Sequence, residues 1–308
     1  MRDGDGQGRR DFLRCMAWAG TALIWTVEGG VLRASALAED SPAPRGDGFR
    51  FVQISDTHLG FHGAANPDAT ETFGRAIARI RAVAPAPALL LHTGDVSHAQ
   101  KPGAFDLAAE RLKELRAGAT YFTPGEHDVF LDGGAEFRER FGAGTLGQGW
   151  RSFDLGGIHF AGLVNVLSYK GEGLGVLGAE QLAWLRADLA PLPASTPVVV
   201  YAHVPLWAVY PRWGWTTADG EQAISLLRRF GSVTVLNGHI HQILQKVEGH
   251  VAFHTAASTA FPQPAPGTAP APGPMAVPAE RLGQVLGVRT VTFAAHGGPL
   301  AVVQHPLT

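Results

Sequence analysis

The sequence has little cysteine: its 308 residues include a single one, Cys15. One thiol excludes an internal disulfide and a thiolate metal cluster, so stability has to come from the core and from bound metal. Charged residues are also scarce, at 17%, and nearly balanced, with a formal net charge of -2. This balance gives no electrostatic reason to expect nucleic acid or an anionic membrane as a partner.

The N-terminal region lacks an apolar run of membrane-spanning length. The stretch from Cys15 to Val27 is shorter than the roughly 20 residues that a spanning helix needs, and Glu28 interrupts it. Arg9 and Arg10 precede the stretch, and small residues follow it at 34–38. This order is typical of a secretory signal. The paired arginines followed by Asp-Phe-Leu resemble the twin-arginine signal of bacterial Tat export.

We therefore expect three segments. Residues 1–38 are interpreted as a Tat signal peptide, and the Pro/Gly/Asp-rich residues 39–48 as a linker. Residues 49–308 are expected to form one catalytic domain, since 45% hydrophobic residues suit a large core. The mature protein would be periplasmic or secreted, without stable membrane insertion. A signal that stays attached as a membrane anchor is the alternative.

Strands and helices alternate through the first half of the domain. Residues 49–54, 88–92 and 119–122 are strand-like apolar runs. Helical spacing of apolar residues predicts helices over 69–83 and 104–117. This β-α-β-α-β order predicts neighbouring parallel strands with right-handed crossovers.

The second half repeats the alternation less regularly. A hairpin is predicted over 150–164, turning at Gly156 and Gly157, and the Pro/Ala-rich stretch 262–280 is expected to be a loop. The other predicted elements are helices at 181–189 and 222–230 and strands at 197–201, 233–236, 243–247, 251–254, 288–293 and 301–304.

Five predicted strand ends are followed by side chains of metal-binding type. Because the carboxyl ends of neighbouring parallel strands meet at one crevice, these side chains are expected to converge there. Each group alone is more typical of a turn or a core histidine, but the five together in this order indicate a metal centre. Oxygen and imidazole donors without thiolate suit Mn, Fe, Zn or Co. The groups are Asp56-Thr57-His58, Gly94-Asp95, Gly125-Glu126-His127-Asp128, His203 and Gly238-His239-Ile240-His241.

The order Asp-x-His, Gly-Asp, Gly-x-His-Asp, His, Gly-His-x-His resembles that of the calcineurin-like metallophosphoesterases, which include purple acid phosphatases and class III cyclic-nucleotide phosphodiesterases. The resemblance covers about residues 50–255. It implies a four-layer α/β/β/α sandwich of two mixed sheets and a pair of metal ions, Fe and/or Mn or Zn. It also implies the ligand division: Asp56, His58 and His241 on one metal, His203, His239 and the residue at 126 on the other, and Asp95 bridging.

The resemblance also implies a reaction on a small-molecule phosphoester. Two cations about 3.5–4 Å apart clamp an in-line displacement and lower the pKa of a bridging water, so that a metal-bridged hydroxide attacks phosphorus. His127 is expected to protonate the leaving oxygen as the general acid. Asp128 is expected to hold the tautomer of the His127 ring.

Glu126 departs from the family pattern, which has Asn at this position. An ionised Glu raises the side-chain ligand charge from two negatives to three. This charge should favour ferric iron or bind divalent ions more tightly, and should favour a diester monoanion over a monoester dianion. Alternatives are a Glu126 that turns away or is protonated, and a metal-binding protein or non-hydrolytic redox enzyme on the same fold. A noncatalytic scaffold is disfavoured because every other ligand position is filled.

Other side chains border the expected site without a spacing that secures them. His98 lies three residues after Asp95, where purple acid phosphatases place a Tyr, so no tyrosinate band is expected. It either points into the cleft or caps the following helix. An aromatic cluster after His203 forms a stacking wall for substrate or packs onto the core: Trp207, Tyr210, Trp213 and Trp215. His62, Asn66 and His254 are further neighbours.

Overall fold

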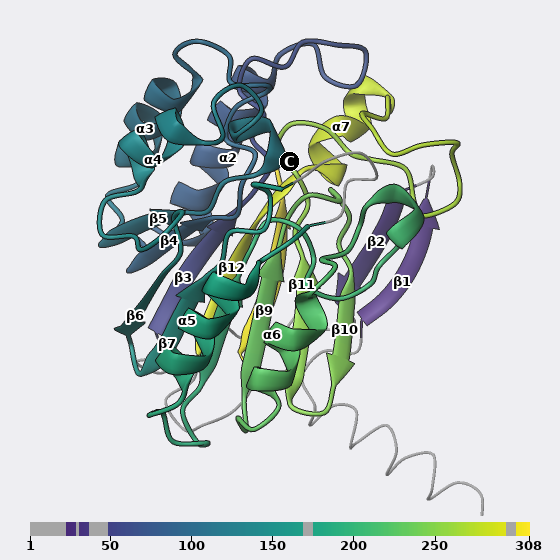
Figure 1. Cartoon of the computed structure of the whole chain (residues 1–308). Coiled ribbons are helices and arrows are strands. Elements are labelled where there is room, and N and C mark those ends of the chain that lie inside the picture. Colours follow the sequence, from purple (N-terminus) through teal and green to yellow (C-terminus); the bar gives the residue numbers. More distant parts are fainter. Residues whose placement is uncertain (1–22, 29–30, 37–48, 169–174, 294–299) are drawn as a thin grey trace, which may run out of the picture.

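The computed structural model describes residues 23–28, 31–36, 49–168, 175–293 and 300–308 (Figure 1). The rest of the expected signal peptide and the whole expected linker lie outside the described residues. Strands β1 (Leu23–Glu28) and β2 (Val31–Ala36) pair as a separate antiparallel two-stranded sheet. Within the described ranges, no helix combines the length and apolar character needed to cross a membrane.

Two mixed sheets form the centre of the domain (Figure 1). The five-stranded sheet has the order β13-β12-β3-β4-β5, and its strands are β3 (Phe49–Ile54), β4 (Leu89–His92), β5 (Ala119–Phe122), β12 (Gly287–Phe293) and β13 (Ala301–Pro306). The six-stranded sheet has the order β10-β11-β9-β8-β7-β6, and its strands are β6 (Arg151–Leu155), β7 (Ile158–Gly162), β8 (Val198–Tyr201), β9 (Val233–Asn237), β10 (Gln245–Glu248) and β11 (Val251–Thr255). The predicted parallel pairing of β3, β4 and β5 is confirmed.

The buried strands carry apolar side chains on both faces, and the two faces belong to different cores. In β8, Val199 and Tyr201 belong to the cluster between the sheets, whereas Val198 and Val200 belong to the cluster beneath helices. This alternation follows from the two-residue period of a strand. Both faces are covered, which is why these strands read as continuous apolar runs in the sequence.

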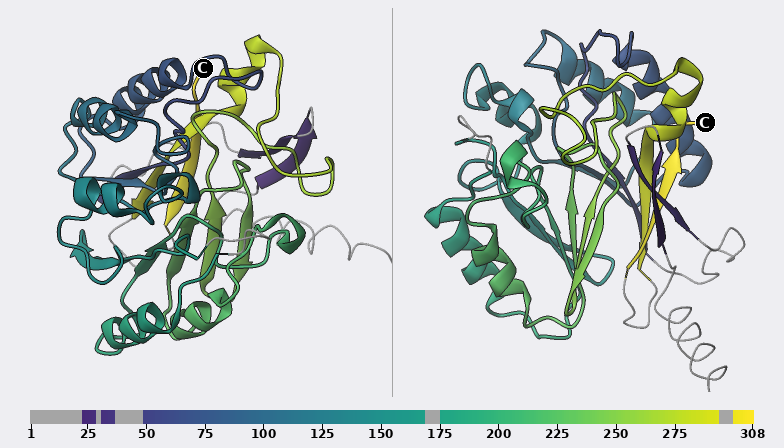
Figure 2. Two further views of the ribbon diagram at one scale, coloured as in Figure 1. Left: turned by 45° about the horizontal axis from the view of Figure 1, so that its top comes forward. Right: turned by 90° about the vertical axis from the view of Figure 1, so that its right-hand side faces the viewer.

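Helices cover the outer faces of both sheets (Figure 2). The described helices are α2 (Ala69–Val83), α3 (Ala104–Lys113), α4 (Ala135–Phe141), α5 (Ala179–Leu189), α6 (Gly220–Leu227) and α7 (Ala279–Val285). Helix α2 packs Phe73 and Ile77 against Val52 and Leu90 of the five-stranded sheet. Helices α5 and α6 pack on the six-stranded sheet. The expected four-layer α/β/β/α sandwich is confirmed.

Several element boundaries differ from the prediction. Helix α3 ends at Lys113 rather than at 117, because Arg116 has a left-handed φ of 51° that a helix cannot include. Helix α6 occupies Gly220–Leu227 rather than 222–230. Helices α4 and α7 were not predicted. Each is 7 residues long, and α4 buries Phe137 alone, so its apolar periodicity is too weak to recognise.

Candidate metal centre

The structure brings together all seven side chains that the sequence suggested as ligands. They follow the carboxyl ends of β3, β4 and β5 in one sheet and of β8 and β9 in the other, so the centre lies where the two sheets meet. All seven are buried, none with more than 7% of its surface exposed. They are Asp56, His58, Asp95, Glu126, His203, His239 and His241.

Five of these residues have a left-handed backbone. The φ angles are 54° at Asp56, 40° at His58, 53° at Asp95, 68° at His239 and 51° at His241. This conformation costs a non-glycine residue about 1–2 kcal/mol. Such strain persists where the surrounding structure imposes it, and it concentrates at functional sites. Here it turns residues two apart in sequence so that both side chains of each pair face the candidate centre.

Asp56, His58 and His241 form the first group. His58 Nε2 lies 3.2 Å from His241 Nε2, and His241 Nε2 lies 3.3 Å from Asp56 Oδ1. Their donor atoms all lie within 4.8 Å of one another, which is compatible with one shared metal ion. This group matches the set that the resemblance assigned to the first metal.

Glu126, His203 and His239 form the second group. The two oxygens of Glu126 reach different rings, with Oε2 2.9 Å from His203 Nε2 and Oε1 3.0 Å from His239 Nδ1. The carboxylate therefore faces into the site rather than turning away. Asp95 joins the groups, because its Oδ2 lies 3.4 Å from His58 Nε2 and 3.4 Å from His203 Nε2.

Main-chain carbonyls select the tautomers of two histidines. His203 Nδ1 lies 2.7 Å from Thr93 O, and His241 Nδ1 lies 2.6 Å from Phe261 O. Only a protonated nitrogen donates to a carbonyl, so each neutral ring presents an unprotonated Nε2 to the site. Metal-binding histidines are commonly oriented in this way.

The charge of the site also fits two cations. Three carboxylates are buried together, and their ion-pair partners within the described part of the chain are histidines rather than Lys or Arg. Buried charge of one sign requires compensation. Glu126 Oε2 and His203 Nε2 lie 2.9 Å apart as an ion pair, but neither atom makes a well-aligned hydrogen bond among the described residues, and neither does the buried Asp56 Oδ2.

The pKa shifts of His203, Glu126 and Asp95 also reflect the excess of buried negative charge. Burial lowers the pKa of His203, but the Asp95 and Glu126 carboxylates outweigh this effect and raise it well above its usual value. Burial raises the pKa of Glu126, yet His239 and His203 hold it well below its usual value. Burial and the charge of Glu126 raise the pKa of Asp95.

His127 lies directly beside this centre. Its main-chain N–H donates to Asp95 Oδ1 at 2.9 Å, and its ring lies 4.8 Å from the ring of His58. Its Nδ1 is buried and has no hydrogen-bond partner among the described residues. Burial lowers the pKa of His127 to about 4. The ring therefore lies at the edge of the candidate centre with a nitrogen that has no hydrogen-bond partner among the described residues.

Asp128 does not hold the His127 ring, contrary to expectation. Its carboxylate accepts hydrogen bonds from the main-chain N–H groups of Val96 at 3.0 Å, Ser97 at 2.8 Å and Gly125 at 3.0 Å. These bonds consume its acceptor capacity on the backbone. Asp128 thereby ties the loop that carries Asp95 to the loop that carries Glu126.

His98 points toward the candidate metal ligands rather than capping a helix. Its Nδ1 lies 3.3 Å from His58 Nδ1, and its ring stacks on His127 with centroids 4.8 Å apart. The aromatic cluster after His203 packs into the protein instead of lining the site: Trp213 and Trp215 are buried and their ring centroids lie 5.1 Å apart.

The remaining neighbours make structural contacts. His62 Nδ1 is exposed and lies 2.8 Å from Pro67 O, whereas Asn66 donates to Ala260 O at 2.6 Å. His254 is buried, and burial lowers its pKa to about 3. Sequence reasoning missed Phe261, whose carbonyl orients His241 and whose ring stacks on His58 at 4.7 Å. A carbonyl is present at every residue, so the sequence carries no signal for it.

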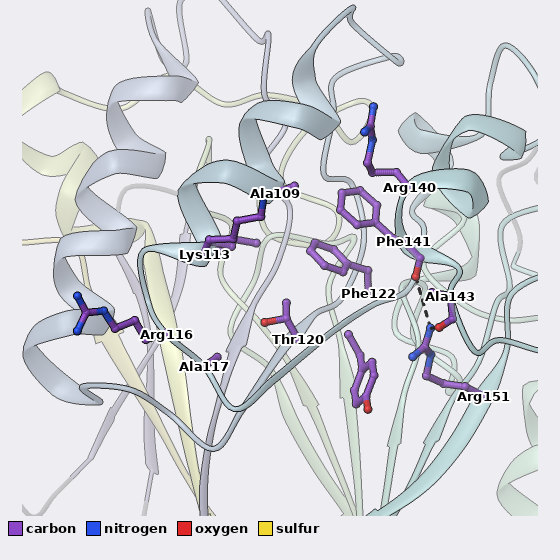
Figure 3. A pocket seen from close by; sticks show the side chains of 12 residues that line it. Ala109, Lys113, Arg116, Ala117, Thr120, Phe122, Arg140, Phe141, Ala143 and Arg151 are labelled. Atoms are coloured by element: carbon purple, nitrogen blue, oxygen red, sulfur yellow. Dashed lines mark hydrogen bonds between the residues drawn. The ribbon is translucent and has the colours of Figure 1, made fainter.

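A cavity of about 480 Å³ lies elsewhere, between α3, α4, β5 and β6, and none of the metal-binding residues lines it (Figure 3). Three of its four basic side chains already have partners. Arg140 lies 2.7 Å from Asp106, and Lys113 lies 2.6 Å from Glu110. Arg151 donates to the carbonyl of Ala143 at 2.9 Å. The buried carboxylate and histidine cluster, rather than this cavity, is therefore the candidate active site.

A sequence profile described as calcineurin-like phosphoesterase matches residues 49–243. The chain belongs to this family. This calcineurin-like phosphoesterase is 28% identical over 216 residues to a 3′,5′-cyclic-nucleotide phosphodiesterase from Nostoc sp.. The aligned region covers 68% of this chain and 78% of the relative. This chain is also 28% identical over 213 residues to a probable cyclic nucleotide phosphodiesterase from Rhodopseudomonas palustris, covering 67% and 76% of the two chains.

A solved structure has the same fold. The dimetal phosphatase from Danio rerio superimposes with a TM-score of 0.66 at 14% identity, over 84% of this chain and 96% of the other. Together, the family match, the relatives and the buried clusters make the chain a metal-dependent phosphoric ester hydrolase of the calcineurin-like family.

Proposed function

We propose that this calcineurin-like phosphoesterase is a phosphodiesterase that hydrolyses 3′,5′-cyclic nucleotides. The observation that carries the proposal is the pair of buried three-residue groups, Asp56/His58/His241 and Glu126/His203/His239, with Asp95 between them. The cyclic-nucleotide phosphodiesterases among its relatives support the choice of substrate class.

The protein would hold two metal ions through these residues, drawn from Fe, Mn and Zn because the donors are oxygen and imidazole. Bound there, the ions would supply Lewis-acid stabilisation of the phosphoryl oxygens and activation of water. The protein itself orients the histidine rings that would bind the metals. The carbonyls of Thr93 and Phe261 hold the rings of His203 and His241, so each is ready to bind without rearrangement.

His127 is proposed as the general acid. Opening a cyclic diester expels a sugar alkoxide, which is a poor leaving group and benefits from a proton. The ring of His127 lies beside the centre with an unpartnered Nδ1 among the described residues. Its pKa is lowered to about 4 by burial, and a phosphate anion bound next to the ring would raise it, because opposite charge favours the imidazolium.

Glu126 supports a diester over a monoester. Its carboxylate lies within 3.0 Å of both His203 and His239, inside the centre. A third carboxylate repels a monoester dianion more strongly than a diester monoanion, because a buried site screens charge poorly.

The proposal is tested by loading the full chain with Mn²⁺ and measuring hydrolysis of cyclic AMP, cyclic GMP and bis-p-nitrophenyl phosphate. Asp95→Asn serves as the control, since it removes the carboxylate shared by both groups. We expect metal-dependent release of nucleoside monophosphate that this variant abolishes. Hydrolysis of the chromogenic diester without hydrolysis of either cyclic nucleotide would contradict the substrate class, and no hydrolysis at all would contradict the function.

We also propose export by the twin-arginine route. The motif at Arg9 and Arg10, the apolar stretch and the small residues after it support this. Replacing both arginines by lysine should leave the protein in the cytoplasm of a Tat-competent bacterial host, whereas the parent chain should be recovered from the periplasm. Equal export of the two chains would exclude this route.

A further inference from the structure

Two adjacent apolar side chains are exposed next to the metal centre. Phe130 is 52% exposed and Leu131 is 76% exposed, although both follow the loop of Glu126 and His127 directly. Single exposed apolar residues are ordinary on protein surfaces. A neighbouring pair at the edge of a catalytic centre is a different case, because apolar surface grouped there is typical of a ligand-contact site.

The ring of Phe130 contacts the ring of His127, the proposed general acid. Its centroid lies 5.1 Å from that of His127 at an interplanar angle of 61°. His127 in turn stacks on His98 at 4.8 Å, and His98 contacts Phe61 at 5.1 Å. Phe130 is the outermost ring of this series and the one that solvent reaches most. A ligand bound at the metals can thus meet its free face within one ring of His127.

The loop that carries the pair is held in place. Val129 is buried in a cluster with Val164 and Val204. On the other side, Gln100 accepts the N–H of Leu131, and its Nε2 donates to Asp132 Oδ1 at 2.9 Å. These contacts hold the backbone on both sides of Phe130 in place before any ligand arrives. Preorganisation of this kind lowers the entropy lost on binding.

We propose that Phe130, flanked by Leu131, forms the subsite for the nucleobase of the substrate. The inference rests on the proposed function, in which the phosphate lies at the metals. A nucleobase is flat and uncharged, and stacking on an aromatic ring is sequence-tolerant because every base has a π face. The subsite therefore distinguishes nucleotides from phosphoesters without a base, and does not distinguish adenine from guanine.

The test compares equilibrium binding of AMP and of ribose 5-phosphate to the metal-loaded full chain by calorimetry. The two ligands share the phosphate and the sugar and differ in the base. We expect the wild type to bind AMP at least about fivefold more tightly, from the usual strength of base stacking on an aromatic side chain. Phe130→Leu should remove most of this preference, and Phe130→Trp should keep it because the flat ring remains.

Val247→Ala is the matched control, because Val247 is 62% exposed and lies on β10, outside the site. It should leave both affinities unchanged. Equal binding of AMP and ribose 5-phosphate by the wild type, a full preference retained in Phe130→Leu, or no binding of either ligand would overturn the subsite. Hydrolysis is scored separately. A chain that shows the Phe130-dependent preference but hydrolyses no phosphoester contradicts the proposed function alone.

Discussion

His98 Nδ1 lies 3.3 Å from His58 Nδ1. The other ring nitrogen of His58, Nε2, lies 3.4 Å from Asp95 Oδ2 and faces the candidate metal centre. His98 therefore contacts the nitrogen of the ligand ring that points away from the centre. A partner in that position fixes the orientation of a metal-binding histidine.

Replacement of His98 by Ala should weaken metal binding. Loss of such an outer partner typically costs about 10–100-fold in metal affinity. Titration of the metal-free protein with Mn²⁺ measures the change. His62→Ala is the control, since His62 is exposed and contacts the carbonyl of Pro67. An unchanged Mn²⁺ affinity in His98→Ala would show that His98 does not position His58.

Replacement of Glu126 by Asn should shift the substrate preference toward monoesters. The substitution removes one buried negative charge from between His203 and His239 and restores an amide donor. The ratio of kcat/KM for bis-p-nitrophenyl phosphate to that for p-nitrophenyl phosphate should fall by about tenfold, as expected for about 1.4 kcal/mol of lost repulsion. Metal content is measured on the same samples. If neither the ratio nor the metal content changes, the charge of Glu126 does not govern selectivity.

Replacement of His127 by Ala should slow the hydrolysis of substrates with poor leaving groups more than that of substrates with good ones. General acid catalysis contributes about 10²–10⁴-fold where the leaving oxygen needs a proton. Cyclic AMP should therefore lose about 100-fold or more in kcat, and bis-p-nitrophenyl phosphate, whose phenolate leaves unaided, should lose far less. Equal losses on the two substrates, at unchanged metal content, would assign His127 to binding instead of proton transfer.

Removal of the metals should destabilise the fold. Asp56, Asp95 and Glu126 are buried together, so the metal-free protein is left with uncompensated negative charge. Reloading at a free concentration about 1,000 times the Kd should restore about 4 kcal/mol. Differential scanning calorimetry of chelated and Mn²⁺-reloaded protein measures this difference. Mg²⁺, which prefers all-oxygen sites, serves as the comparison ion. An identical Tm for chelated and Mn²⁺-reloaded protein would argue against a buried metal site.

His159 should give stability that depends on pH. Burial lowers its pKa, but hydrogen bonds to Asp188 at 2.9 Å and Asp154 at 2.8 Å outweigh burial and raise it. A raised folded-state pKa contributes stability that is complete below the unfolded value of about 6.5 and is lost as pH rises through the folded value.

The variant His159→Gln should therefore lower Tm more at about pH 5.5 than at about pH 8.5. The expected difference corresponds to about 1 kcal/mol, or about 2–4 °C, because Asp154 is largely exposed and its bond is screened. Ser225→Ala, at an exposed helix position, should show no pH-dependent change. A His159→Gln effect that is equal at both pH values would mean that His159 is not charged in the folded protein.

The amino-acid sequence by itself determined the order of the main elements. Helix α2 was predicted with its observed bounds, Ala69–Val83, because its apolar residues repeat at helical spacing, and the structure shows Asp68 capping its first turn. The same sequence indicated the metal-binding side chains, since each follows an apolar strand whose end must lie at the edge of a sheet. The short helices α4 and α7 were not predicted from the sequence, because they bury few side chains.

The tertiary structure alone decided which groups surround those side chains. Asp128 bonds main-chain N–H groups 31 and 32 residues away instead of the adjacent His127 ring, and His241 is oriented by a carbonyl 20 residues away. Phe130 is exposed beside the candidate centre, although its apolar residue type is typical of a protein core. Main-chain donors and acceptors are identical at every position, and the exposure of a side chain depends on what packs against it. Residue type and spacing therefore predict neither the main-chain partner of a side chain nor its exposure. Both depend on how the sheets and loops assemble.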